Sequence, residues 1–214
     1  MDITSYLLGK NSAGGGSSDL DWSVIGYSNT PQAITEAYNA AVNIKNNWTS
    51  TSRPTDFKDT IIICPYIDTS SLTSWGYFAS ECKKLLQIPL LDSSNVTDMN
   101  NAFSNSSALT SVPFFNTSKV TNFSSMFSGC ISLITIPIFD TSSGTLFGSM
   151  FNNCNKLSNE SLDNILQMCI NAISYTGTKT LKGLGFRSNT YSTTRIQALP
   201  HYQDFIDAGW TIGY

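Results

Sequence analysis

The sequence is poor in charge and in histidine. Only 13% of its 214 residues are Asp, Glu, Lys or Arg, and the net charge is −3. No basic block is present that could neutralise nucleic-acid phosphates, which argues against a nucleic-acid partner. The single histidine, His201, is expected to be a surface or cap residue, because no nucleophile motif, P-loop or dinucleotide-binding glycine pattern accompanies it. We therefore expect a protein that is not an enzyme and uses no cofactor.

The chain also lacks the cysteine spacings of a metal site. Its five cysteines form no C-x-x-C pair, and an odd number does not suit a fully paired disulfide framework. They are Cys64, Cys82, Cys130, Cys154 and Cys169. We expect buried free thiols in a reducing compartment and no bound metal.

The opening segment, residues 1–18 (MDITSYLLGKNSAGGGSS), lacks the features of a secretory signal. Such a signal places basic residues before an unbroken apolar stretch of about 7–15 residues, whereas polar residues interrupt this stretch and Lys10 follows it. The stretch is also far shorter than the roughly 20 residues that span a bilayer, and we expect no membrane insertion. Two interpretations remain for this segment: a docking peptide on a glycine tether, or a frayed terminus. The docking residues would be Ile3, Tyr6, Leu7 and Leu8.

A repeat organises the middle of the chain. Prolines recur at one constant interval, at Pro65, Pro89, Pro113 and Pro137. Four units of equal length fill residues 61–156 without insertion or deletion. Each contains a short apolar stretch, the proline, an Asp/Asn–Thr/Ser–Ser turn and then apolar residues at helical spacing. One unit cannot bury its own apolar stripe, so we expect the units to stack as a solenoid.

The pattern within a unit predicts its secondary structure. The residues before each proline are expected to pair with neighbouring units in a parallel ladder. The later apolar residues predict a short helical stretch; in the third unit they are Val120, Phe123, Met126, Phe127 and Cys130. The predicted fold class is therefore an α/β repeat solenoid.

Both ends of the repeat region are expected to be capped. Residues 19–60 predict a strand and a helix that form the N-terminal cap. Residues 157–214 predict atypical capping repeats: a helix from about Glu160 with Asn159 or Ser158 as its N-cap, a strand over residues 179–186, and one or two short helices that end at Gly209.

Three columns of the repeat allow two interpretations each. The acidic column consists of Asp68, Asp92, Asn116 and Asp140. It could bind calcium, but its amide and its place at a turn favour capping. In another column, Cys130 and Cys154 lie one unit apart, within disulfide reach, whereas Ser106 in the same column favours a small buried filler.

The seventh column either forms an exposed apolar ridge that binds a partner or belongs to the core. Strand alternation would turn it outward, and a proline that breaks the alternation would turn it inward. Its members are Ile67, Leu91, Phe115 and Phe139.

The units VPFFNTSKVTNFSSMFSGC and IPIFDTSSGTLFGSMFNNC resemble the BspA-type leucine-rich repeats of bacterial and phage surface proteins, and the resemblance covers about residues 20–214. It implies a leucine-rich-repeat-like right-handed coil with a parallel sheet on one face and short helices on the other. It also implies adhesion or interaction without catalysis. Gly144 departs from the Leu or Val of the other units, which predicts a locally looser fourth unit.

The opening segment resembles the N-terminal segments of virion structural proteins of phages that infect Gram-positive bacteria. This resemblance implies a display protein on a phage head or tail (a decoration or a fibre), assembled in the host cytoplasm and docked to other virion proteins through residues 1–18. The solenoid would contact a virion protein or a host-surface protein or glycan, and virion symmetry could make it oligomeric. The alternative is a bacterial cell-surface or secreted adhesin. No export signal, lipidation cysteine or wall anchor is visible, which favours the virion interpretation.

Overall fold

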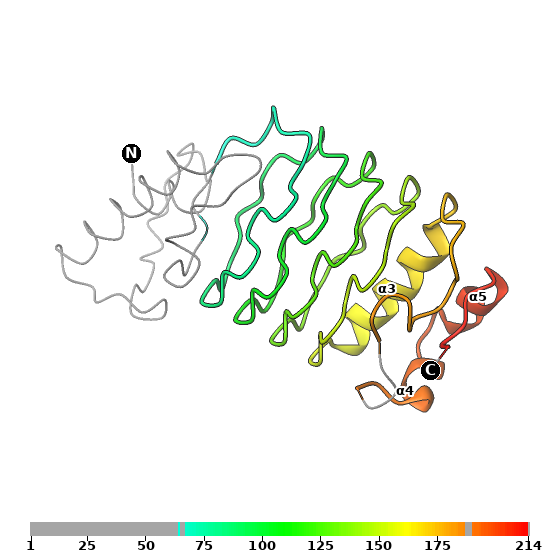
Figure 1. Ribbon diagram of the computed structural model, residues 1–214. Helices are drawn as coiled ribbons and strands as arrows, with labels where there is room; N and C mark the ends of the chain where they lie inside the picture. Colours follow the sequence, from blue (N-terminus) through cyan, green and yellow to red (C-terminus); the bar gives the residue numbers. More distant parts are fainter. Residues whose placement is uncertain (1–63, 65–66, 187–189, 214) are drawn as a thin grey trace, which may run out of the picture.

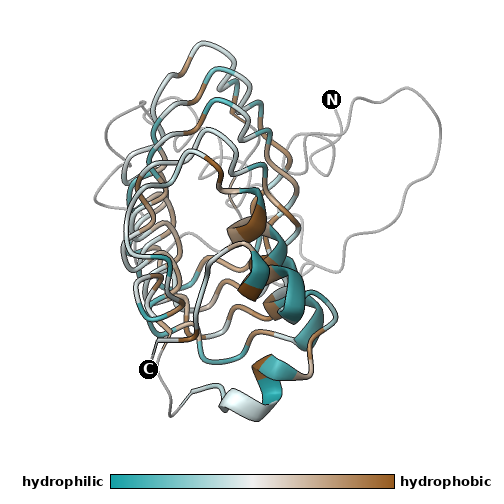
Figure 2. Cartoon of the chain, turned by 90° about the vertical axis from the view of Figure 1, so that its right-hand side faces the viewer, coloured by the Kyte–Doolittle hydropathy of each residue, from teal (hydrophilic) through white to brown (hydrophobic). Residues whose placement is uncertain are grey.

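The computed structural model describes residue 64, residues 67–186 and residues 190–213. The predictions for the docking peptide and for the N-terminal cap lie outside these residues. In the described part, successive segments form coils that lie side by side along one axis (Figure 1). Seen along that axis, the coils follow nearly the same outline (Figure 2). We number the four coils by their units, which begin at residues 61, 85, 109 and 133.

Backbone pairing between the coils keeps the spacing of the repeat. Parallel bridges join Ser74 to Asp98, Asp98 to Asn122, and Asn122 to Leu146. Before the prolines, where the ladder was expected, the only bridge between described residues joins Ser111 to Thr135. Each bridge is isolated, and the described part contains no extended strand. The most regular pairing therefore lies after the Asp/Asn turn, in the segment that was expected to be helical.

The predicted helices of the repeats are wrong, because these segments are runs of β-turns. In the third coil the carbonyls of Phe123, Ser125 and Phe127 accept from the N–H three residues later, at 3.1, 3.1 and 3.0 Å. The N–H groups of the same three residues donate to carbonyls of the fourth coil at 2.8–2.9 Å. An α-helix would use all these N–H groups internally and leave none to join the coils. The turns use alternate N–H groups and leave the others for the next coil.

The turn runs require a left-handed backbone at two positions of each coil, four residues apart. Type II turns need a positive φ at their third residue, and small or amide side chains tolerate it best. The positions are Tyr77 and Glu81, Asn101 and Asn105, Ser125 and Gly129, and Ser149 and Asn153, with φ between 53° and 79°. Asn, Ser or Gly occupies every one of them outside the first coil.

Stacked columns of apolar side chains form the core. Phe103, Phe127 and Phe151 lie in successive coils with ring centroids 5.6 and 5.8 Å apart and planes tilted by 12° and 13°. Each buried side chain of this kind contributes about 1.5–3 kcal/mol. The looser packing expected at Gly144 is absent, because the ring of Phe147 fills the space: a Cβ at residue 144 would lie 2.2 Å from it.

The predicted helix after the last repeat is confirmed as α3 (Asn159–Asn171), with Ser158 as its N-cap. It lies against the fourth coil (Figure 1). Its side chains bond to backbone groups that a further coil would otherwise use. The Ser161 hydroxyl donates to Ile134 O and accepts from Ile136 N, both at 3.0 Å, and Asn164 Nδ2 donates to Ile136 O at 2.9 Å.

The predicted short helices are also confirmed, as α4 (Thr193–Gln197) and α5 (Tyr202–Asp207), and Gly209 follows α5 with a φ of 84°. The strand expected over residues 179–186 is wrong. Its pairing is limited to an isolated parallel bridge between Thr180 and Thr211 and a bond from Lys182 N to Ile212 O at 3.3 Å. The residues from Leu181 form turns, because they accept bonds from the turn run of the fourth coil. Ser149 and Phe151 donate to carbonyls of this segment at 2.9 and 2.8 Å.

Candidate interaction surface

The structure buries the column that was considered as a partner-binding ridge. Ile67 and Leu91 are 6% and 3% exposed, and Phe115 and Phe139 are fully buried. The core interpretation of this column is therefore the correct one. The physical reason is the proline that precedes the column in each unit. Burial repeats at every third residue across the proline, as in Ile88 and Leu91 (7% and 3% exposed), which is the period of a polyproline-like backbone and not the alternation of a strand.

The exposed apolar residues lie one position earlier, and we call them the apolar column. Leu90, Phe114 and Ile138 are 65%, 58% and 41% exposed. They occupy the same place in the second, third and fourth coils, directly after the proline. The sequence did contain a signal for the outward position of these residues. Apolar residues that recur every third position across the proline would have predicted it, whereas the alternation of a strand predicted the opposite.

The residues that lead up to the apolar column carry no charge. The segments that end at it read LQIPL at residues 86–90, TSVPF at 110–114 and ITIPI at 134–138, and the exposed carboxylates of Asp92 and Asp140 follow two residues after the column. Ile134, in the fourth coil, is also 44% exposed. Such side chains recognise apolar groups by contact area.

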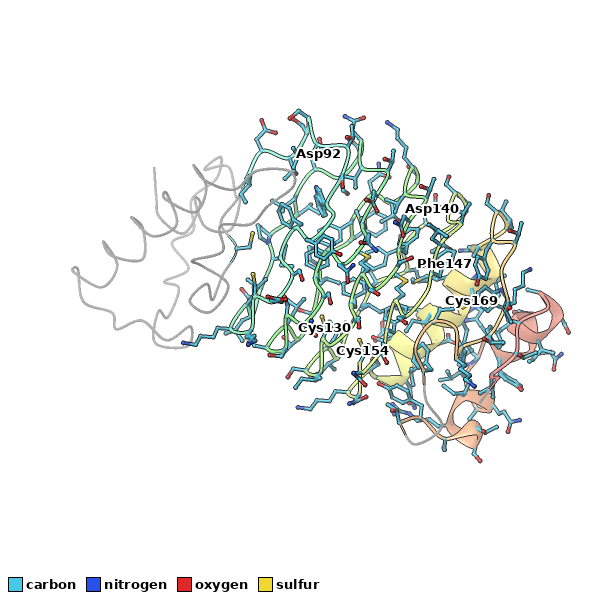
Figure 3. All side chains as sticks on the ribbon, in the orientation of Figure 1. Asp92, Cys130, Asp140, Phe147, Cys154 and Cys169 are labelled. Carbon is cyan, nitrogen blue, oxygen red and sulfur yellow. The ribbon has the colours of Figure 1, made fainter. Side chains whose placement is uncertain are left out.

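The acidic column caps turns and marks one edge of the coils, where Asp92 and Asp140 are labelled in Figure 3. Asp140 Oδ1 accepts from the hydroxyl and the backbone N–H of Ser142 at 2.7 and 2.9 Å. These hydrogen bonds lower the pKa of Asp140, and the equivalent bonds from Ser94 lower the pKa of Asp92. The capping interpretation is confirmed. Among the residues that the structure describes, no group of three or more His, Cys, Asp or Glu side chains could hold a metal ion.

The hydroxyl column, directly after the acidic column, has a role that the sequence did not reveal. Its side chains are buried, and each hydroxyl donates to a carbonyl of the element that follows in the stack. Thr69 donates to Asp92 O at 2.7 Å and Thr117 to Asp140 O at 2.8 Å. Equivalent bonds are made by Ser93 to Asn116 O and by Thr141 to Met168 O. These buried bonds hold the turn edge of successive coils at a fixed spacing.

Cys130 and Cys154 are free thiols, so the filler interpretation is confirmed and the disulfide is wrong. Their sulfur atoms donate to the carbonyls of Phe103 and Phe127 at 3.1 Å, as the Ser106 hydroxyl does to Ala79 O at 2.6 Å. Burial raises the pKa of Cys130 to about 12. A thiol that stays protonated is a poor nucleophile, so Cys130 is unsuited to nucleophilic attack near neutral pH.

His201 links two helices of the C-terminal region. It is the N-cap residue of α5, and its Nδ1 lies 2.7 Å from Asp163 Oδ2 in α3. Its backbone N–H donates to Asp163 Oδ1 at 2.9 Å. His201 thus lies in the C-terminal capping region, as expected, but its side chain makes no capping bond to α5 and pairs with Asp163 instead.

A small cavity lies between the fourth coil and the C-terminal region, lined mainly by apolar side chains such as Phe147, Cys169 and Trp210. It has room for about one water molecule, which is too little for an organic ligand. The described residues also include no helix that is long and apolar enough to cross a bilayer. Among the exposed large apolar side chains of the described residues, those of the apolar column recur at one position in three successive coils, so we build the functional proposal on this column.

Comparison with known proteins identifies the family of this chain. Residues 68–176 match the family described as "Mycoplasma protein of unknown function, DUF285". The chain belongs to the DUF285 family. The matched region is just over half of the chain. It contains the whole apolar column, the turn runs of the four coils and α3. No curated protein and no solved structure gave a significant match.

Proposed function

We propose that this DUF285 chain is a non-catalytic interaction protein, a leucine-rich-repeat-like solenoid that presents the apolar column to a protein partner. The observation that carries the proposal is the repetition of large exposed apolar side chains at one position of three successive coils, with 65%, 58% and 41% exposure. Apolar side chains scattered over a surface need no explanation, whereas a contiguous group is characteristic of interaction sites.

The stack supports the column rigidly. Backbone hydrogen bonds join the turn runs of successive coils, and the side chains of the hydroxyl column join the coils at the acidic column. A backbone held in this way loses little further freedom when a partner binds, so the entropy cost is limited to the exposed side chains. A pre-organised surface of this kind suits binding better than catalysis by moving loops.

Two biological settings are compatible with this function. In the first, residues 1–18 dock the protein on a phage virion, and the apolar column contacts another virion protein or a host-surface protein. The uninterrupted glycines after the apolar opening support this setting. In the second, the protein is a bacterial surface adhesin. The description of the matched family as a mycoplasma protein supports the second setting.

Site-specific photo-crosslinking tests the function. A photoreactive amino acid replaces Phe114 in the full chain, produced in its native cell or particle. The matched control places it at Leu146, which is 53% exposed on a column that otherwise carries Ser, Asp and Asn. We expect a covalent adduct with another protein from position 114 and none from position 146. Equal labelling from both positions, or none from position 114, contradicts the proposal.

Deletion of residues 1–18 separates the two settings. In the virion setting, the shortened chain keeps its fold but is lost from purified particles, because its docking peptide is gone. Incorporation at the wild-type level removes the support for that setting. Electrophoresis of purified particles measures the incorporated protein, and circular dichroism of the shortened chain measures its fold.

A further inference from the structure

We infer that the apolar column binds one extended, uncharged peptide segment of the partner protein; this inference rests on the proposed function. The first argument is area. A fully exposed side chain of this size presents on the order of 200 Å², so exposures of 65%, 58% and 41% give a patch on the order of 300 Å². A stable interface between two folded proteins buries about 800 Å² on each partner. The column alone is too small for a second copy of this chain, and its size suits a single segment.

The second argument is the chemistry around the column. Gln87, Ser111 and Thr135 lie beside it in successive coils, and all three are exposed. Their amide and hydroxyl groups can donate to and accept from the backbone of an extended peptide, which has unpaired N–H and C=O groups along its length. The five residues that end at each column position carry no charge, so a charged side chain placed over them would lose hydration and gain no partner, and an acidic one would also meet the carboxylates of Asp92 and Asp140 two residues beyond the column.

The third argument is spacing. Coils that pair backbone to backbone lie about 4.8 Å apart, so three coils place the column residues along about 10 Å. Alternate side chains of an extended peptide are about 6.7 Å apart, so a segment of about five residues spans the column with apolar side chains at alternate positions. Side chains at this spacing fall between those of Leu90, Phe114 and Ile138, which gives contact on both sides of the Phe114 ring.

Selection from a peptide library tests the inference. Random peptides of about ten residues, displayed on cells, are selected in parallel on the full chain, on F114N and on L146N. We expect peptides that bind the full chain to have apolar residues at alternate positions and no charge between them. They should bind L146N equally well and F114N about tenfold or more weakly, because Phe114 is the central side chain of the column. The L146N control is well matched, because Asn already occupies the same column at Asn122.

Three outcomes overturn the inference. Selected peptides that are charged, or that bind F114N equally, show that the column does not bind an uncharged segment. A dimer in sedimentation that F114N dissociates shows that a second copy is the occupant. Competition by a synthetic peptide of residues 1–10 shows that the N-terminal segment of this chain is the occupant. Crosslinking from position 114 together with any of these results leaves the proposed function standing, whereas absence of crosslinking removes the function itself.

Discussion

At the scale of single residues, side chains in one column replace one another by their hydrogen-bonding capacity. Ser106, Cys130 and Cys154 differ in size and polarity, yet each donates to a carbonyl 27 residues earlier. Sequence reasoning identified them as small fillers from their size alone. The shared acceptor shows that the column needs a donor as well, which explains why a serine is tolerated at a buried position.

This requirement predicts the effect of two substitutions at residue 106. Ser106→Ala removes a buried hydrogen bond of 2.6 Å to Ala79 O, and we expect it to lower the free energy of unfolding by about 1 kcal/mol. Ser106→Cys keeps a donor of the type found in the next two coils, and we expect a smaller loss. Urea unfolding followed by circular dichroism measures both. A Cys variant less stable than the Ala variant would show that size, and not hydrogen bonding, governs the column.

The acidic column predicts a dependence of stability on pH. Because Ser142 lowers the pKa of Asp140 in the folded state, this carboxylate stabilises the fold above its unfolded pKa, and the contribution is lost as the pH falls through the folded pKa. We expect Asp140→Asn to unfold at nearly the wild-type urea concentration at pH 7, because Asn116 makes the same contacts with Ser118 at 3.2 and 2.8 Å. Between about pH 5 and pH 2 the variant should lose less stability than wild type. Equal losses in the two proteins would contradict this assignment.

At the scale of elements, α3 replaces a further coil by means of its side chains. Ser161 and Asn164 lie on one face of the helix and satisfy the backbone groups of Ile134 and Ile136. An unpaired backbone group at this position would be costly, because Ile136 is only 3% exposed. The helix could be predicted from its cap and apolar spacing, but its contact with Ile136 could not, because the contact depends on how the helix lies across the coil.

The role of α3 predicts that Ser161→Ala lowers the free energy of unfolding by about 1–3 kcal/mol, because it leaves the buried Ile136 N–H without a partner. Ser158→Ala removes the N-cap bond from the Ser161 N–H and the hydroxyl bond to Ser161 Oγ but leaves the Ile136 N–H paired, and it should cost about 1 kcal/mol. Glu160→Gln, on the exposed face, is the control and should leave stability close to wild type. Chemical denaturation measures the series. A Ser161→Ala variant as stable as the control would show that α3 does not seal the fourth coil in this way.

The turn runs show where sequence reasoning about elements fails. Val120, Phe123, Phe127 and Cys130 have the spacing of a helical stripe, and all are buried on one side, as expected. A run of turns produces a similar spacing of inward side chains, because each turn closes between residues three apart, such as Phe123 and Met126 or Phe127 and Cys130. What distinguishes the two is where the alternate N–H groups go, and that depends on the neighbouring coil.

At the scale of the whole molecule, stability depends on contacts between successive coils. Alternate backbone N–H groups of each turn run donate to the next element of the stack, as Phe103 N does to Met126 O and Phe127 N does to Met150 O, both at 2.9 Å. Rings stack in the same way, as Phe103 on Phe127 and Phe127 on Phe151. In such a stack, the neighbours of a removed coil can pair with each other when the register is kept.

We therefore expect that deletion of residues 109–132 leaves a folded protein, in which the fourth coil packs directly on the second and Phe151 stacks on Phe103. It should unfold cooperatively at a lower urea concentration, because one set of interfaces is lost. Deletion of residues 109–120 is the control, and it should abolish cooperative unfolding because it breaks the register of every column. Circular dichroism and urea titration measure both. Loss of folding in the whole-coil deletion would contradict the additive stack.

The sequence by itself determined the spacing of the coils, the capping turns and the helices that follow the last repeat. These features depend on which residue types recur at fixed intervals, and proline, Asp/Asn and serine each have strong local preferences. Only the tertiary structure decided that turns and not helices follow each cap, and that Leu90, Phe114 and Ile138 face outward while Phe115 is buried. The physical reason is that the adjacent coil supplies the acceptor of a backbone N–H. It also decides, as much as the local sequence does, which face a residue near a proline occupies.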